Sequence, residues 1–248
     1  MEAAAVDQTR HCLNCETPLL PTQHYCSVCG QKADTKRLTL HDITHALVHV
    51  FTHADHSVFS LVRDLTYKPG RVARDYVEGK RRKYFNPFTF ALVVVGVTSL
   101  VMAFTKLVDF TPYSAGNPVG AFLQRNINLI VLAQLPMLSL FSMLLFRSEK
   151  LHFAEHLVLA SYATGFRSVF STLVVAPLWY FTQWNYALTV GLSMLAFFIY
   201  FGIACAQFHS GNRWWLWFKG FLAGALAHAS VTAAIWLAFY IFYTFFRT

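Results

Sequence analysis

The chain has 248 residues, of which 56% are apolar and 13% are charged. Soluble domains carry about 25% charged residues, so this sequence lacks the polar side chains that would cover a water-exposed globule. The formal net charge is +8, and the basic residues concentrate before Pro87, ahead of the long apolar stretches. This composition argues against a soluble protein and predicts an integral membrane protein.

Four of the five cysteines form two CxxC pairs near the N-terminus: Cys12 with Cys15, and Cys26 with Cys29. Each pair can direct two thiolates at one ion, and four thiolates suit tetrahedral Zn²⁺. We therefore expect a structural zinc ribbon over residues 12–30. A redox pair is the alternative, although two pairs in register disfavour it. No signal peptide precedes the cysteines, so we expect this module in the reducing cytosol.

Residues 38–66 predict an amphipathic helix, because apolar residues recur there at the spacing of one helical face. The stretch from Tyr67 to Gly70 is expected to end that helix. A second short helix is expected at about 71–79, ending at Gly79. Together with the basic residues that follow, residues 38–83 are predicted to lie in the membrane interface.

Histidines recur every four residues on the first of these helices: His41, His45, His49 and His53. The simplest interpretation is an amphipathic edge of an interfacial helix. Two alternatives stay open. A pair of histidines four apart can share a metal ion, and a group of histidines can respond to pH near 6.5.

A run of four cations directly precedes the first long apolar segment: Lys80, Arg81, Arg82 and Lys83. Beside a bilayer, each such residue attracts anionic headgroups by about 1 kcal/mol. We expect a topology signal that binds anionic lipid, with a specific site for a phosphate-bearing ligand as the alternative. Nucleic acid is disfavoured as a partner, because the cluster is tethered at the bilayer.

Five apolar segments follow Pro87, at about 87–107, 126–146, 157–181, 186–208 and 217–243. Each approaches the roughly 20 residues that cross a bilayer as a helix. The sequence thus predicts an all-α polytopic membrane protein with about five transmembrane helices in a domain spanning 87–243. Lys and Arg are densest before the first segment, which predicts a cytoplasmic N-terminus.

Polar side chains interrupt the third segment. Glu155 and His156 open it, and Arg167 falls near its middle. An arginine at the bilayer centre costs about 2.5–3.5 kcal/mol on insertion scales, so it must face protein, water or a ligand. The candidate partners are Gln134, Asn128, Tyr162, His228 or an acid from a second copy in a homo-oligomer. His228 and the fifth cysteine, Cys205, are expected to be packed core residues.

Several short motifs occur in a fixed order: Tyr25-Cys26 to Gln31, Phe51-Thr52-His53-Ala54-Asp55, Pro69-Gly70, Arg74-Asp75-Tyr76, Gly79-Lys80-Arg81 and Ala154-Glu155-His156-Leu157-Val158. In these motifs the sequence resembles the bacterial membrane proteins grouped as domain of unknown function 3667, over residues 12–160. The resemblance implies a zinc ribbon joined to a helical membrane domain, and a bacterial inner membrane as its location. The family has no established activity, so the resemblance implies no reaction.

Three functions follow as hypotheses. The leading one is a membrane-embedded binding or scaffold protein whose zinc ribbon docks a cytosolic protein. The alternative is a small-molecule or lipid permease with a path lined by Glu155, His156 and Arg167. The third is an intramembrane metal-dependent enzyme, although the sequence contains no GxSxG, HExxH or phosphate-binding loop.

Overall fold

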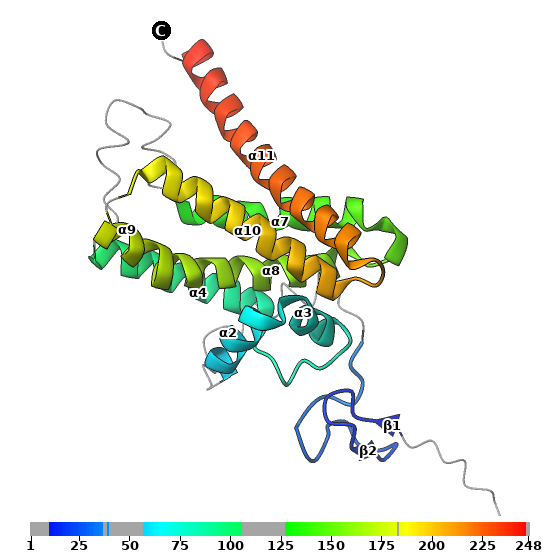
Figure 1. The fold of residues 1–248 in the computed structure, drawn as a ribbon. Helices are drawn as coiled ribbons and strands as arrows, with labels where there is room; N and C mark the ends of the chain where they lie inside the picture. Colours follow the sequence, from blue (N-terminus) through cyan, green and yellow to red (C-terminus); the bar gives the residue numbers. More distant parts are fainter. Residues whose placement is uncertain (1–9, 37–38, 40–56, 106–126, 183, 247–248) are drawn as a thin grey trace, which may run out of the picture.

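The computed structural model describes residues 10–36, 39, 57–105, 127–182 and 184–246 (Figure 1). It confirms a mostly helical chain with a small N-terminal cysteine module. The elements in order are β1 (Arg10–His11), β2 (Pro18–Leu19), α2 (Ser57–Tyr67), α3 (Pro69–Val77), α4 (Pro87–Thr105), α7 (Ile127–Leu145), the 3₁₀-helix η1 (Arg147–Glu149), α8 (Phe153–Phe170), the π-helix η2 (Ser171–Val175), α9 (Ala176–Thr182), α10 (Tyr186–Phe208) and α11 (Arg213–Phe246).

All five predicted apolar segments are helical. Among the described residues, four helices are long and apolar enough to cross a membrane: Pro87–Phe104, Phe153–Thr182, Ala187–Phe208 and Arg213–Phe242. The second of these joins α8, η2 and α9 without a break. The apolar part of α7, Ile130–Leu145, is shorter.

Two of these helices begin four residues before the predicted starts, at Phe153 instead of 157 and at Arg213 instead of 217. Both extensions have a capping side chain. The carboxylate of Glu155 accepts a hydrogen bond of 2.8 Å from the backbone N–H of His152. The side-chain oxygen of Asn212 accepts one of 3.1 Å from the N–H of Trp214. Such caps satisfy N–H groups that lack helical partners.

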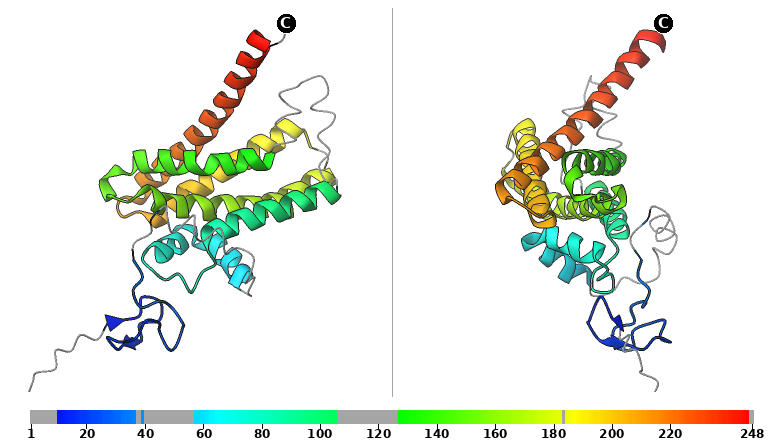
Figure 2. Two further views of the ribbon diagram at one scale, coloured as in Figure 1. Left: turned by 180° about the vertical axis from the view of Figure 1, so that it is seen from behind. Right: turned by 90° about the vertical axis from the view of Figure 1, so that its right-hand side faces the viewer.

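The long helices pack side by side, and the C-terminal half of α11 projects away from the others (Figures 1 and 2). Helices α10 and α11 approach closely because a glycine lies at their contact. A Cβ atom on Gly220 would lie 2.6 Å from the Cβ of Cys205. Small residues of this kind let membrane helices pack backbone to backbone. Cys205 is fully buried here, as the sequence predicted.

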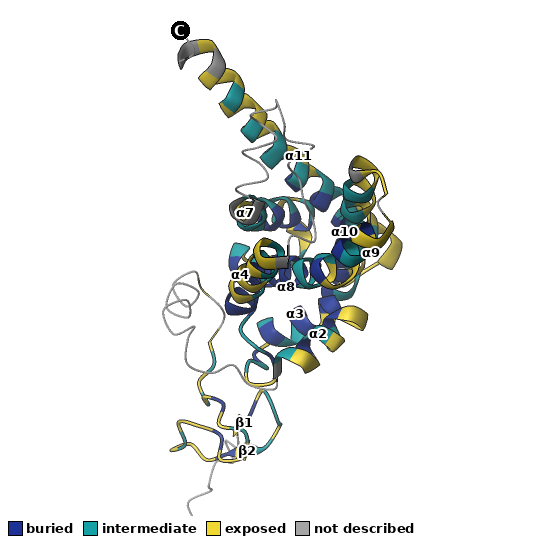
Figure 3. Ribbon diagram, turned by 90° about the vertical axis from the view of Figure 1, so that its left-hand side faces the viewer, coloured by how far each residue is buried: buried dark blue, intermediate teal, exposed yellow. Residues whose placement is uncertain are grey.

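Helices α2 and α3 lie along one side of this bundle, next to α8 and α10 (Figure 3). Their apolar faces are covered by protein, since Leu61, Leu65 and Ala73 belong to the main hydrophobic core. Helix α2 ends at Tyr67 as predicted, but α3 begins at Pro69, because proline is well tolerated in the first turn of a helix. The predicted helix over 38–66 is described only from Ser57 onward.

The cysteine module is a separate small unit with its own core. Strands β1 and β2 pair in antiparallel fashion, with Arg10 opposite Leu19. The side chains of Cys12, Leu19 and Cys26 form the core of this unit, and it is distinct from the helical core. Because so few apolar residues are buried there, the unit depends on its cysteines for stability.

Candidate functional site

The four cysteines meet at one point. Their sulfur atoms all lie within 4.8 Å of one another. The Sγ atoms of Cys12 and Cys29 are 3.5 Å apart, as are those of Cys15 and Cys26. A tetrahedral site with metal–sulfur bonds of about 2.3 Å places its sulfurs about 3.8 Å apart. The cluster therefore has the donor set and nearly the spacing of a four-thiolate metal site.

The surroundings of the thiols also fit a metal site. Hydrogen bonds from the side chain and backbone of Thr17 lower the pKa of Cys15 to about 6. Burial raises the pKa of Cys29 to about 11. Four thiolates this close repel one another, and a divalent cation allows all four to lose their protons. Four protein ligands leave no open coordination position, which is the pattern of a structural site.

The cysteine module sits against the turn that follows α3. Gly79, with a φ of +107°, leaves room for Leu13 of the first CxxC, since an added Cβ would lie 2.7 Å from a methyl carbon of Leu13. The buried side chain of Gln31 donates to the carbonyl of Gly79 (2.7 Å) and accepts from the N–H of Arg82 (3.3 Å). The Nε of Arg82 donates to the carbonyl of Cys29 (3.3 Å). We call this set of contacts the ribbon contact.

The four predicted lipid-binding cations, Lys80 to Lys83, form this same turn, which we call the basic turn. The structure divides them into two pairs. Lys80 and Lys83 both face the carboxylate of Asp75, at 2.8 and 3.5 Å. Burial opposes ionisation of Asp75, but hydrogen bonds from Lys80 and from the hydroxyl of Tyr84 keep its pKa below the usual range.

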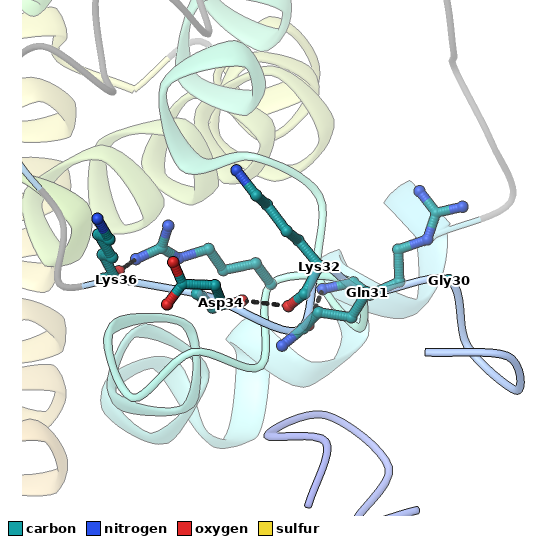
Figure 4. A pocket seen from close by; sticks show the side chains of 8 residues that line it. Gly30, Gln31, Lys32, Asp34 and Lys36 are labelled. Atoms are coloured by element: carbon teal, nitrogen blue, oxygen red, sulfur yellow. Dashed lines mark hydrogen bonds between the residues drawn. The ribbon is translucent and has the colours of Figure 1, made fainter. Parts of the chain in front are cut away.

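The second pair, Arg81 and Arg82, faces the cysteine module. The Nη2 of Arg81 donates to the carbonyl of Lys36 at 2.6 Å. Both arginines line a pocket of about 520 Å³ together with residues 30–32 and 34–36, which include Lys32 and Lys36 (Figure 4). The sequence showed the four cations but not this division, because the contacts of Arg81 and Arg82 join residues 45 and 53 positions apart.

Arg167 finds its partners inside the helical bundle. Its Nη1 donates to the side-chain oxygen of Gln134 at 2.8 Å, and the amide nitrogen of Gln134 lies 3.0 Å from the Nδ1 of His228. The guanidinium also stacks 4.8 Å above the ring of Phe197. Two of the partners proposed from the sequence, Gln134 and His228, therefore lie in one chain of hydrogen bonds, and His228 is a bonded group within the bundle.

The candidate ligand path is not brought together in one cavity. Glu155 lines a pocket with Arg74 and Glu78 at the start of α8. Arg167 lines a different pocket of about 120 Å³ between α8 and α10. Along a helix that rises 1.5 Å per residue, His156 and Arg167 are separated by about 16 Å. His41, His45, His49 and His53 lie outside the described residues.

A polar cluster that the sequence did not indicate lies beside His156. The Nδ1 of His156 is 2.9 Å from the hydroxyl of Ser142, and its ring centre is 5.5 Å from that of His209. The Nδ1 of His209 donates to Glu149 at 3.0 Å, and Glu149 also faces Arg74 at 3.7 Å. Burial lowers the pKa of His209, and Glu149 offsets part of this effect. These residues come from α3, α7, η1, α8 and the C-terminal end of α10, so no local pattern marks them.

Comparison with known proteins gives one match. No curated protein and no solved structure matches the chain. Residues 55–98 match the model of a family described as "Protein of unknown function (DUF3667)". The matched stretch includes α2, α3, the basic turn and most of α4, whereas the cysteine module lies before it. Over residues 55–98 this match supports the resemblance to DUF3667 that the sequence motifs indicate.

Proposed function

We propose that the chain is a membrane-embedded scaffold whose N-terminal module binds a structural zinc ion and docks a cytosolic protein. In this account the chain lies in a bacterial inner membrane with its N-terminus in the cytoplasm. The basic turn directly precedes α4 and holds the module at the surface of the inner leaflet, beside anionic lipid headgroups. Zinc is the metal that four cysteine thiolates in a closed site suit best.

One observation carries this proposal. The ribbon contact fixes the module on the basic turn through Leu13, Gln31 and Arg82, but it leaves other apolar side chains of the module in solvent. Tyr25 is 63% exposed and Val28 is 70% exposed. A unit this small gains nothing in its own stability from such side chains, whereas exposed apolar and aromatic groups are typical of protein-binding surfaces.

The other two hypotheses receive less support. A permease needs a continuous path, and the described residues place Glu155 and Arg167 in separate pockets. The enzyme hypothesis places a second metal at the histidine row and Glu155, and this row lies outside the described residues. The four-cysteine cluster cannot take that role, because it leaves no open coordination position. Within the described residues, this cluster is the one group of side chains placed to hold a metal ion.

The test uses the full chain in lipid nanodiscs exposed to cytosolic proteins. We expect one protein to be retained at fixed stoichiometry by the unmodified chain, and to be lost from a Tyr25→Ser/Val28→Ser variant and after zinc is chelated. An Arg167→Leu variant serves as the matched control and should retain the same protein. Equal retention by the Tyr25→Ser/Val28→Ser variant, with zinc still bound, contradicts the proposal.

A further inference from the structure

The pocket between the cysteine module and the basic turn is strongly cationic. Its lining residues carry four cations, Lys32, Lys36, Arg81 and Arg82, and one acid, Asp34. Figure 4 shows the side chains of Lys32, Asp34 and Lys36 arranged along the segment that leaves the module. Lys80 and Lys83 do not line it, because they face Asp75. The positive charge that remains is therefore concentrated at this pocket.

Arg81 provides a second, independent indication of an anion. Its Nη2 is held by the carbonyl of Lys36. Its Nε is buried and has no hydrogen-bond partner among the described residues. A buried, charged N–H without an acceptor is unfavourable. An anion in the pocket would supply the acceptor, and guanidinium groups match the geometry of phosphate oxygens especially well.

The pocket exists only while the module is folded. The N–H of Cys26 donates to the carbonyl of Gln31 at 2.8 Å, and the N–H of Ala33 donates to the carbonyl of His24 at 2.9 Å. These bonds fix the segment that carries Lys32 on one wall. The other wall is tied to the module by the bond from Arg82 to Cys29. Loss of the metal would free the segment from the module and separate the two walls.

We propose that this pocket binds a phosphate group, and that phosphate binding and zinc binding strengthen each other. The phosphate comes from a lipid headgroup or from a soluble phosphate, since the chemistry of recognition is the same. Arg81 and Arg82, which line the pocket, lie a few residues before α4, the first of the long apolar helices. This position places the pocket within reach of lipid headgroups. The inference rests on the proposed zinc ribbon but not on the docking of a protein partner.

Reciprocity follows from thermodynamics. If zinc organises the pocket, phosphate must raise the affinity for zinc by the same factor by which zinc raises the affinity for phosphate. Couplings of this kind typically amount to about 5–150-fold. Zinc affinity, measured by competition with a chelator, therefore reports phosphate binding without any assay of activity.

The experiment measures zinc affinity of the full chain in dodecyl maltoside micelles, which contain no phosphate, with and without inorganic phosphate, and with phosphatidic acid added to the micelles. We expect at least one phosphate source to raise the affinity by about tenfold. The Lys32→Gln and Lys36→Gln variants should lose this increase, because both leave the backbone contacts of the pocket in place. The control is Lys83→Gln, which removes the same charge from the same surface but outside the pocket, and it should keep the increase.

The outcomes distinguish a failure of the phosphate site from a failure of the proposed zinc ribbon. An increase with phosphatidic acid alone identifies a lipid headgroup as the source, and an increase with both probes identifies the phosphate group in general. If the increase in zinc affinity persists in the Lys32→Gln and Lys36→Gln variants, or is lost equally in Lys83→Gln, the pocket is not the phosphate site. If one zinc ion binds per chain and neither probe changes its affinity, the inference fails while the proposed zinc ribbon stands. If no zinc binds, the proposed function fails as well.

Discussion

Gly79 lies where the cysteine module packs closely on the helical part of the chain. Its φ of +107° is accessible to glycine and strained for other residues, and a Cβ there would lie 2.7 Å from a methyl carbon of Leu13. Glycine thus serves both the turn and the contact at this position. The sequence alone predicted only that Gly79 ends a helix, because it does not show what packs on the turn.

Replacing Gly79 with alanine should weaken the ribbon contact. Backbone strain of this kind costs about 1–3 kcal/mol, and the displacement of Leu13 adds to it. We expect faster amide hydrogen exchange over residues 30–36 with unchanged exchange in the helices. Gly211→Ala is the control, because Gly211 has a φ of +138° but its nearest contact is Leu216 at 3.9 Å. Unchanged exchange in Gly79→Ala would show that the contact does not hold the module.

His209 makes the stability of the chain depend on pH. Burial holds the pKa of His209 below its usual value, although Glu149 partly offsets this effect. Arg74 and Lys219 also disfavour the charged form of the ring, and the ring of His156 lies 5.5 Å away. The unfolded chain, with a histidine pKa of about 6.5, binds the proton more readily. The contribution of neutral His209 to stability is therefore present above about pH 6.5 and is lost as pH falls through the lowered pKa.

The expected result is a lower thermal unfolding midpoint at pH 5 than at pH 7.5, measured from helical circular dichroism in detergent. The His209→Gln variant should show a smaller difference between the two pH values, because glutamine can still donate to Glu149 but does not titrate. An equal pH difference in both proteins would assign the effect to other groups.

At the scale of elements, the structure shows helices that are held together by close backbone contacts. The periodicity and hydropathy of the sequence were sufficient to predict every long helix after Pro87, because a segment in lipid has no alternative to a helix. They did not predict which helices touch. The packing of α10 on α11 depends on Gly220 and Cys205 facing each other across two helices, and neither residue stands out in an apolar sequence.

Replacing Gly220 with leucine should separate α10 from α11. The added Cβ would lie 2.6 Å from that of Cys205, and overpacking of this kind typically costs about 1–3 kcal/mol. We expect a lower unfolding midpoint in detergent. Gly96→Leu is the control, because nothing lies within 4 Å of a Cβ at Gly96 on α4. Equal effects of the two substitutions would contradict the close packing of α10 and α11.

The cysteine module should unfold independently of the helices, because its small core of Cys12, Leu19 and Cys26 is separate from theirs. Zinc binding to such modules contributes about 10–16 kcal/mol, far more than this core can supply. We expect Cys26→Ser to lose the bound metal and the exchange protection of residues 10–36. The helical circular dichroism and membrane insertion of the variant should stay as in the unmodified chain. Retention of one zinc ion per chain by the variant would show that Cys26 is not a ligand.

At the scale of the whole molecule, charge and hydropathy divide the chain into a basic, cysteine-containing head and a set of apolar helices. Both parts were predicted from composition and motifs. The way in which they are joined was not, since the sequence suggested that all four cations of the basic turn face lipid. Asp75 neutralises two of them, and the other two hold the module. The turn thus connects the two parts, and it lies within the stretch that matches the DUF3667 family.

The apolar side chains that the helices expose are consistent with this division into a basic head and a set of apolar helices. Trp236, Leu237 and Tyr240 on the projecting half of α11 are 54–68% exposed. Side chains of this kind would be unfavourable in water over so long a helix, but they are suited to contact with lipid. They are consistent with a chain whose apolar helices contact lipid and whose cysteine-containing head lies in water.

Protease protection of the module in oriented membrane vesicles tests this account most directly. After an alkaline wash that removes peripheral proteins, the chain should remain in the membrane fraction. A protease added to inverted vesicles should cleave the N-terminal module once its zinc is chelated, whereas intact right-side-out vesicles should protect it. Release of the chain by the wash, or cleavage of the module only in right-side-out vesicles, would contradict the account.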